Sequence, residues 1–94
     1  MTKTNNFVRD ITPDAIALDW SKKLITAITH GLEKGQTSIE LGGRFNVVYE
    51  MNRWQDALQQ ALRICEHAEE YEHCANIANL IMLTQMRMLA KPQP

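Results

Sequence analysis

The stretch 44-RFNVVYEMNRWQDALQQALRICEHAEEYEHCANIANLIMLTQMRMLAK-91 decides the fold of this chain. It contains neither glycine nor proline, the two residues that most strongly interrupt regular structure. Apolar residues recur along most of it at intervals of three and four, as they do on one face of an α-helix. We therefore predict helix from about Asn52, a candidate capping residue, to Ala90.

This helical stretch is predicted to fold back once, into helices near 52–67 and 70–90. The two parts share a pattern at an offset of seventeen residues, Trp54-x-x-Ala57-x-x-x-Ala61-x-x-Ile64 and Tyr71-x-x-Cys74-x-x-x-Ala78-x-x-Ile81. On one straight helix these stripes would point about 100° apart, and the helix would exceed about 50 Å. A single helix is the alternative. The pattern resembles part of a tetratricopeptide repeat, but Asn52 stands at that repeat's glycine and no second repeat follows, so no family is assigned.

A first helix is predicted near 13–31. Thr12 is a candidate cap, Pro13 suits the first helical position, and Asp14 lies at the positive end of the helix dipole. Apolar residues then follow at helical spacing. The helix is expected to end near Gly31, or one turn later at Gly35, because glycine accepts the left-handed conformation that closes a helix.

A β-hairpin is predicted near 37–50, where the apolar period changes to two. Alternating residues on either side of Gly42-Gly43 form two runs: Ile39 and Leu41, then Phe45, Val47 and Tyr49. The alternative places Val47 onward in the next helix and makes the chain all-α. The predicted fold is therefore mainly α, three helices with a short β-hairpin between helix 1 and helix 2.

We expect one small helical domain over residues 12–91. Residues 1–11 are expected to form a partly ordered N-terminal tail, anchored by Phe7, Val8 and Ile11, and residues 92–94 a short C-terminal tail. The predicted core consists of Trp20, Leu24, Ile28, Trp54, Leu58, Ala61, Ile64, Ile77 and Ile81.

Composition argues against several classes of partner. The net charge of −1 lacks the basic excess typical of nucleic-acid-binding proteins. The apolar run 74–86 is shorter than the about 20 residues needed to span a bilayer. Two cysteines are too few for a disulfide framework, and residues 1–6 lack the apolar core of a signal peptide. We expect a cytoplasmic protein that binds neither nucleic acid nor membrane.

One group of residues offers metal or acid–base chemistry. Cys65, His67, His73 and Cys74 are zinc-type donors close in sequence, and the histidines are spaced three or four residues from glutamates. On a continuous helix His67 and Cys74 share a face but lie about 10 Å apart along the axis. A small metal-dependent or acid–base protein is therefore the alternative hypothesis. The preferred prediction has no catalytic residue, no metal and no cofactor.

The C-terminal segment instead predicts a protein partner. Residues 74–86 carry no charge, so a helix there is apolar nearly all round, and the rest of the chain can cover only part of it. Methionine is common on surfaces that accept partners. The predicted contact residues are Leu80, Met82, Leu83, Met86 and Arg87. We expect a non-catalytic interaction module, either homodimeric or bound to a larger complex, of the kind that phages and mobile elements encode as modulators or inhibitors.

Overall fold

A computed structural model describes residues 13–90, and within them the chain forms three helices and one hairpin. The elements are α2 (Pro13–Lys34), β1 (Ser38–Leu41), β2 (Val47–Glu50), α3 (Met51–His67) and α4 (Tyr71–Leu89). The predicted fold class is confirmed. The two alternatives, an all-α chain and one continuous helix over 52–90, are wrong. Thr12 and the tail residues Phe7, Val8 and Ile11 lie outside the described residues.

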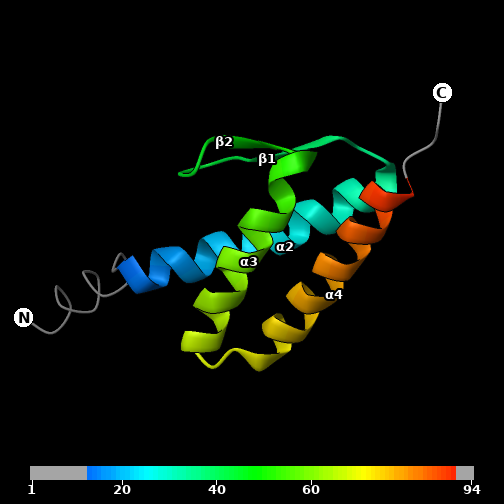
Figure 1. Cartoon of the computed structure of the whole chain (residues 1–94). Coiled ribbons are helices and arrows are strands. Elements are labelled where there is room, and N and C mark those ends of the chain that lie inside the picture. The colour runs from blue at the N-terminus through cyan, green and yellow to red at the C-terminus, as the bar shows by residue number, and fades with distance from the viewer. Residues whose placement is uncertain (1–12, 91–94) are drawn as a thin grey trace, which may run out of the picture.

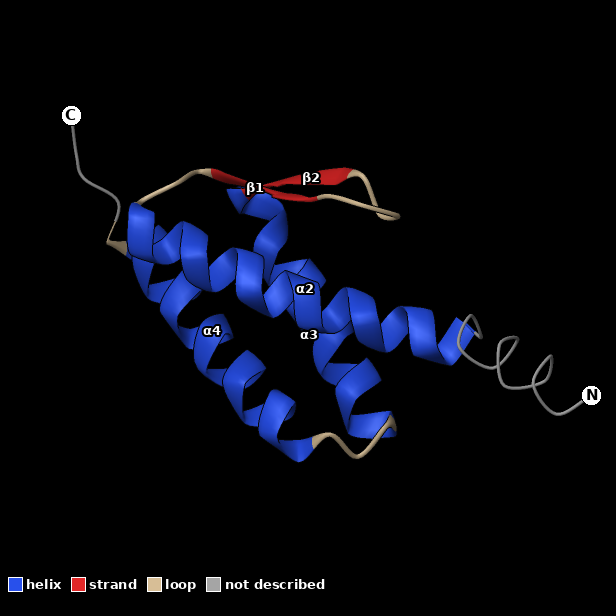
Figure 2. Cartoon of the chain, turned by 180° about the vertical axis from the view of Figure 1, so that it is seen from behind, coloured by secondary structure: helices blue, strands red, loops and turns tan. Residues whose placement is uncertain are grey.

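The helices are arranged in two layers. Helices α3 and α4 lie side by side and antiparallel, and α2 crosses them on one side (Figures 1 and 2). The hairpin lies at the end where α3 begins, with β1 packed against α2 and β2 against α3. Helix α4 is at the edge of the molecule in both views. One of its faces is therefore left without a neighbouring element among the described residues.

Helix α2 ends at the second of the two predicted glycines. Gly35 has a φ of 69°, its N–H donates to Leu32 O at 3.3 Å, and the N–H of Gln36 donates to Gly31 O at 2.8 Å. These are the two bonds of a Schellman motif. Gly31, the first of the two glycines, lies inside α2 and does not end the helix. A Cβ there would come within 2.9 Å of Ile39 Cγ2, so glycine allows α2 to approach β1 closely.

The hairpin has a longer loop than its glycine pair suggests. Strands β1 and β2 pair antiparallel from Ser38 opposite Glu50 to Leu41 opposite Val47, which leaves residues 42–46 as the loop. Phe45, expected in a strand, belongs to this loop, where the Arg44 guanidinium lies 5.8 Å from its ring centroid. The inward-facing residues Ile39 and Leu41 are buried against the helices. This packing stabilises the hairpin, because a two-stranded sheet alone is marginal in water.

The start of α3 is determined by the hairpin rather than by a capping side chain. The helix begins at Met51, directly after β2, and Glu50 at its N-cap makes no side-chain capping bond. The Met51 N–H donates to Thr37 O at 2.9 Å. The strand pairing therefore satisfies the first donor of the helix, and the predicted role of Asn52 as the cap is wrong.

The turn between α3 and α4 falls within the predicted region. Glu69 has a φ of 59°, its N–H donates to Glu66 O at 3.1 Å, and the Glu70 N–H donates to Cys65 O at 2.9 Å. This is a second Schellman closure, with a glutamate at the left-handed position that glycine usually occupies. The turn brings the apolar faces of α3 and α4 together.

The core lies where the three helices meet below the hairpin. Most of the predicted core residues are buried: Leu24, Ile28, Trp54, Leu58, Ala61 and Ile77. Trp20, Ile64 and Ile81 are half-buried at its edge. The core also contains residues that the sequence analysis placed elsewhere or left out: Ile39, Leu41, Ala57, Cys65 and Leu80. Trp54 is anchored by a hydrogen bond from its Nε1 to Tyr49 O at 3.0 Å.

Candidate functional site

The residues predicted to contact a partner fall into three groups. Met82, Leu83 and Met86 are exposed, at 52%, 39% and 55% of their surface. Leu80 is only 5% exposed and belongs to the core, so its assignment to a contact surface is wrong. Arg87 is half-buried, and its guanidinium lies 5.9 Å from the ring centroid of Trp54.

Polar bonds between α3 and α4 accompany the burial of Leu80. Gln55 of α3 donates from Nε2 to Ile81 O at 2.8 Å and also to the Thr84 hydroxyl. The Thr84 hydroxyl donates to Ile81 O at 3.0 Å. Thr84 is 1% exposed, so these bonds lie in the contact between the helices and set the rotation of α4 about its axis. At that rotation Ile77, Leu80 and Thr84 face inward.

The opposite side of α4 forms a continuous exposed face that the sequence analysis recognised only in part. We call it the outer face, and define it as Ala75, Asn79, Met82, Leu83, Met86 and Leu89. Leu89 is the most exposed of these, at 80% of its surface. Its spacing of seven residues from Met82 and three from Met86 is visible in the sequence and could have placed it here.

Electrostatics make the outer face unusual for a protein surface. From Cys74 to Met86, α4 has no charged residue. Arg87 borders this face, and its Nη1 is buried without a hydrogen-bond partner among the described residues. A buried guanidinium nitrogen without an acceptor is energetically unfavourable.

The four residues of the alternative metal site do not come together as ligands. Cys65 is buried in the core, His67 is exposed at the end of α3, and His73 and Cys74 are half-buried at the start of α4. The described residues contain no group of three or more His, Cys, Asp or Glu side chains placed to hold a metal ion. The geometry therefore gives no support to a zinc site.

The thiols are also poorly suited to nucleophilic chemistry. Burial raises the pKa of the Cys65 thiol, and the nearby Cys74 raises it further. Desolvation raises the pKa of the Cys74 thiol too, followed by the effect of the Glu66 carboxylate. Because both pKa values are raised, both side chains are predominantly neutral thiols at physiological pH. The thiolate is the reactive form, so neither cysteine is a good nucleophile.

The histidines lack the surroundings of an acid–base site. His73 Nε2 lies 3.9 Å from Glu70 Oε1, at the limit of an ion pair and at i, i+3 spacing on one turn. His67 lies at the edge of an open hollow of about 540 Å³ between α2 and α3, which also includes Asp14 and Arg63. Asp14, Arg63 and His67 are exposed, so this hollow does not enclose a substrate away from water.

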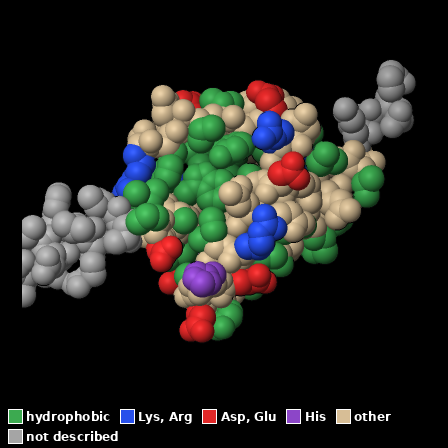
Figure 3. All heavy atoms as spheres, turned by 60° about the vertical axis from the view of Figure 1, so that its left-hand side comes forward, with side chains coloured by type: hydrophobic (Ala, Val, Ile, Leu, Met, Phe, Trp, Pro, Cys, Tyr) green, Lys and Arg blue, Asp and Glu red, His purple; other side chains and the backbone are tan. Residues whose placement is uncertain are grey.

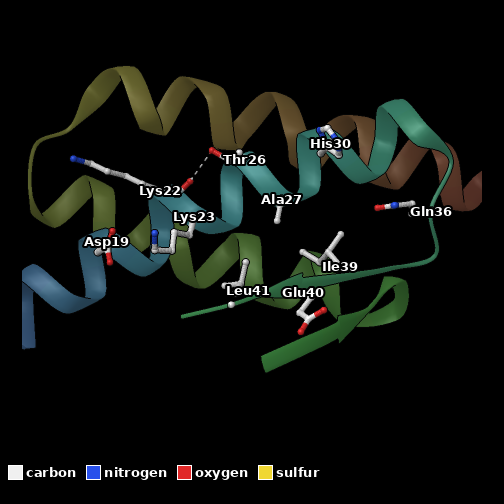
Figure 4. A pocket seen from close by; sticks show the side chains of 11 residues that line it. Asp19, Lys22, Lys23, Thr26, Ala27, His30, Gln36, Ile39, Glu40 and Leu41 are labelled. Atoms are coloured by element: carbon white, nitrogen blue, oxygen red, sulfur yellow. Dashed lines mark hydrogen bonds between the residues drawn. The ribbon is translucent and has the colours of Figure 1, made fainter. Parts of the chain in front are cut away.

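A groove of about 600 Å³ lies beside the contact between α2 and β1. In Figure 4 Ile39 points from β1 toward α2 and Ala27 points from α2 toward β1, while Glu40 points away. Lys22 and Lys23 line the α2 side of the groove. Both lysines are exposed, and their ammonium groups do not point toward a common position in the groove. They therefore do not form a binding site for an anion.

A second apolar area lies near the start of α2. Figure 3 shows hydrophobic side chains gathered on this side of the molecule. The hollow there, of about 510 Å³, is lined by Ile16, Trp20, Phe45 and Ile64. Trp20 donates from Nε1 to the Tyr49 hydroxyl at 3.2 Å, which ties α2 to the hairpin. These contacts suit packing between elements, and they bring no reactive groups together.

Comparisons with family models, curated proteins and solved structures found no match to this chain. Within residues 13–90, no helix combines the length and the apolar character that crossing a bilayer requires. Inferences about function therefore rest on the surfaces described above, of which the outer face of α4 is the most distinctive.

Proposed function

We propose that this protein is a non-catalytic protein–protein interaction module and that the outer face of α4 is its contact surface. One observation carries the proposal. Met82, Met86 and Leu89 expose more than half of their surfaces along one side of α4, which carries no charged residue from Cys74 to Met86. Single exposed apolar residues are ordinary on protein surfaces, whereas a continuous apolar face usually marks an interaction site.

Energetics favour covering this face. Full burial of a large apolar side chain contributes about 1.5–3 kcal/mol, so covering a half-exposed methionine gains about 1 kcal/mol. Met82, Leu83, Met86 and Leu89 together would contribute about 4 kcal/mol from this chain alone. Association costs about 4–15 kcal/mol in lost freedom of motion. The apolar surface of the partner must therefore contribute a similar amount.

The surroundings of the outer face fit this role. Asn76 and Gln85 are exposed on α4 beside the face, and Arg87 lies at its border. Polar residues around an apolar centre are typical of interfaces between proteins. With Leu80 in the core, the proposed contact is centred on Met82 and Met86. The absence of a disulfide between Cys65 and Cys74 fits a reducing compartment, for which we propose the cytoplasm.

Photo-crosslinking in cells tests the proposal. A benzophenone amino acid replaces Met82 in one variant and Val48 in a matched control. Val48 is also apolar and 55% exposed, but it lies on the outward side of β2. We expect irradiation to trap one or a few adducts of defined mass from position 82 and none of these from position 48. Equal adduct patterns from both positions, or no adduct from position 82, would contradict the proposal.

A further inference from the structure

We infer that the outer face of α4 binds the same face of a second copy of this chain, with the two helices antiparallel. This inference rests on the proposed function, because it names the partner of the same surface. It also commits to a register, in which Ala75 of one copy lies opposite Met86 of the other.

The exposed residues of the outer face follow one side of α4 at a regular spacing. Ala75, Asn79, Met82, Met86 and Leu89 are separated by four, three, four and three residues, and all are exposed. This is the spacing of the seam along which two helices pair in a coiled coil. At 100° per residue, the seam lies on the side of α4 opposite the buried residues Ile77 and Thr84. A second helix could therefore approach without disturbing the core.

The sizes of the residues along this seam favour antiparallel pairing. The seam has a small residue, Ala75, near its N-terminal end and a large one, Met86, near its C-terminal end. An antiparallel pair centred between Leu80 and Ile81 places Ala75 opposite Met86 and Asn79 opposite Met82. Met86 of one copy then fills the space beside the small Ala75 of the other, as close packing requires. A parallel pair would leave Ala75 facing Ala75, and its helix dipoles would be aligned unfavourably.

The outer face is also electrostatically compatible with a second copy of itself. Pairing buries no charged side chain, because the stretch from Cys74 to Met86 has none. The ends differ in sign, with Glu72 in the first turn of α4 and Arg87 in the last. An antiparallel pair brings the acidic end of one helix toward the basic end of the other, whereas a parallel pair brings like charges together. The arrangement is isologous, the commonest form of homodimer.

The contact is short, so the dimer should be weak. A helix of 19 residues is about 28 Å long, and its seam is about 10 Å wide. This footprint of about 280 Å² on each chain is well below the roughly 800 Å² per partner of a standard interface, as in weak and transient contacts. We expect a dissociation constant on the order of 10–100 µM, which corresponds to the weaker part of the usual range of protein affinities. The oligomeric state must therefore be measured over a range of concentrations.

Cross-linking between two variants that each have one accessible cysteine tests the register. Ala75→Cys and Met86→Cys are made separately, both with Cys74→Ser, while Cys65 is buried and protected. A short bismaleimide should join the two variants when they are mixed, and neither variant should join to itself as efficiently. Val48→Cys mixed with Met86→Cys is the control and should give background only. Stronger self-joining than mixed joining would indicate a parallel pair and overturn the register.

Sedimentation equilibrium tests self-association independently of cross-linking. The wild type should dimerise with rising concentration. Met82→Lys should weaken the dimer by about 100-fold, because two like charges would meet beside the twofold axis. Val48→Lys should leave it unchanged. A wild type that stays monomeric at millimolar concentration would overturn the inference. If Met82 still gave photo-adducts with another protein, the proposed function would stand without self-pairing.

Discussion

Truncating two neighbouring leucines of α4 should have very different effects on stability. Leu80 and Leu83 are three residues apart in a helix and were expected on the same surface. Leu80 is 5% exposed in the core, whereas Leu83 is 39% exposed on the outer face. Leu80→Ala and Leu83→Ala remove the same atoms and change helix propensity equally. Any difference in their free energies of unfolding therefore reports the difference in burial.

The expected size of the difference follows from that burial. Removing three carbons from a buried leucine loses about 2.4 kcal/mol of transfer free energy. The cavity left in a packed core brings the usual total to about 3 kcal/mol. Since 1 kcal/mol shifts the Tm of a domain this size by about 4–8 °C, Leu80→Ala should lower the Tm by roughly 12–24 °C. At Leu83 solvent can fill the space, and the loss should be about 1 kcal/mol.

Urea denaturation followed by tryptophan fluorescence provides the measurement. Trp54 is fully buried, so its emission should report unfolding of the core. The experiment uses protein well below the expected dimer dissociation constant, so that pairing does not contribute to the free energy. Equal losses for the two variants, or a larger loss for Leu83→Ala, would show that the described rotation of α4 is incorrect.

Three further changes test other features of the structure. Glu69→Gly should stabilise the protein by about 0.5–1 kcal/mol relative to Glu69→Ala in urea denaturation, because glycine adopts the positive φ of 59° without strain. Gly31→Ala should lower stability by about 1 kcal/mol, although alanine has the better helix propensity. The new Cβ would lie 2.9 Å from Ile39 Cγ2 and 3.2 Å from the Trp54 ring. A higher Tm for this variant would contradict the expectation. Burial raises the pKa of the Cys65 thiol in the folded protein. Above about pH 8.5 the thiol therefore ionises in the unfolded chain before it does in the folded one, and the free energy of unfolding should fall. At neutral pH the thiol is protonated in both states and should not make stability depend on pH. Thermal scans of Cys65→Ala should show a shallower fall.

The order and type of the elements could be read from local chemistry. Each of the deciding signals acts within a few residues: Pro13 at the start of α2, Gly35 directly after its end, and the change of apolar period before β1. The acidic turn between α3 and α4 was also correctly placed, from an offset pattern that could not lie on one face. Such signals need no knowledge of tertiary packing, which is why the fold class was predictable.

The start of α3 shows where local reasoning fails. Asn52 is a good capping residue by type, yet the helix begins at Met51. The deciding interaction is the bond from the Met51 N–H to Thr37 O, between residues that are distant in sequence. Pairing across the hairpin thus takes the place of the side-chain cap. A bond of this kind cannot be inferred from propensity at one position.

The error at Leu80 has the same origin and matters more for function. When one side of a helix is polar, the sequence itself shows which side faces the core. On α4 the stretch from Cys74 to Met86 has no charge to mark the outside, so several rotations place apolar residues inward. At the observed rotation Gln55 of α3 donates to Ile81 O and to the Thr84 hydroxyl between the helices, and these bonds favour that rotation over the others. The same uniformity that made the rotation hard to predict leaves an apolar face after the core is filled, and this face is the basis for the proposed dimer.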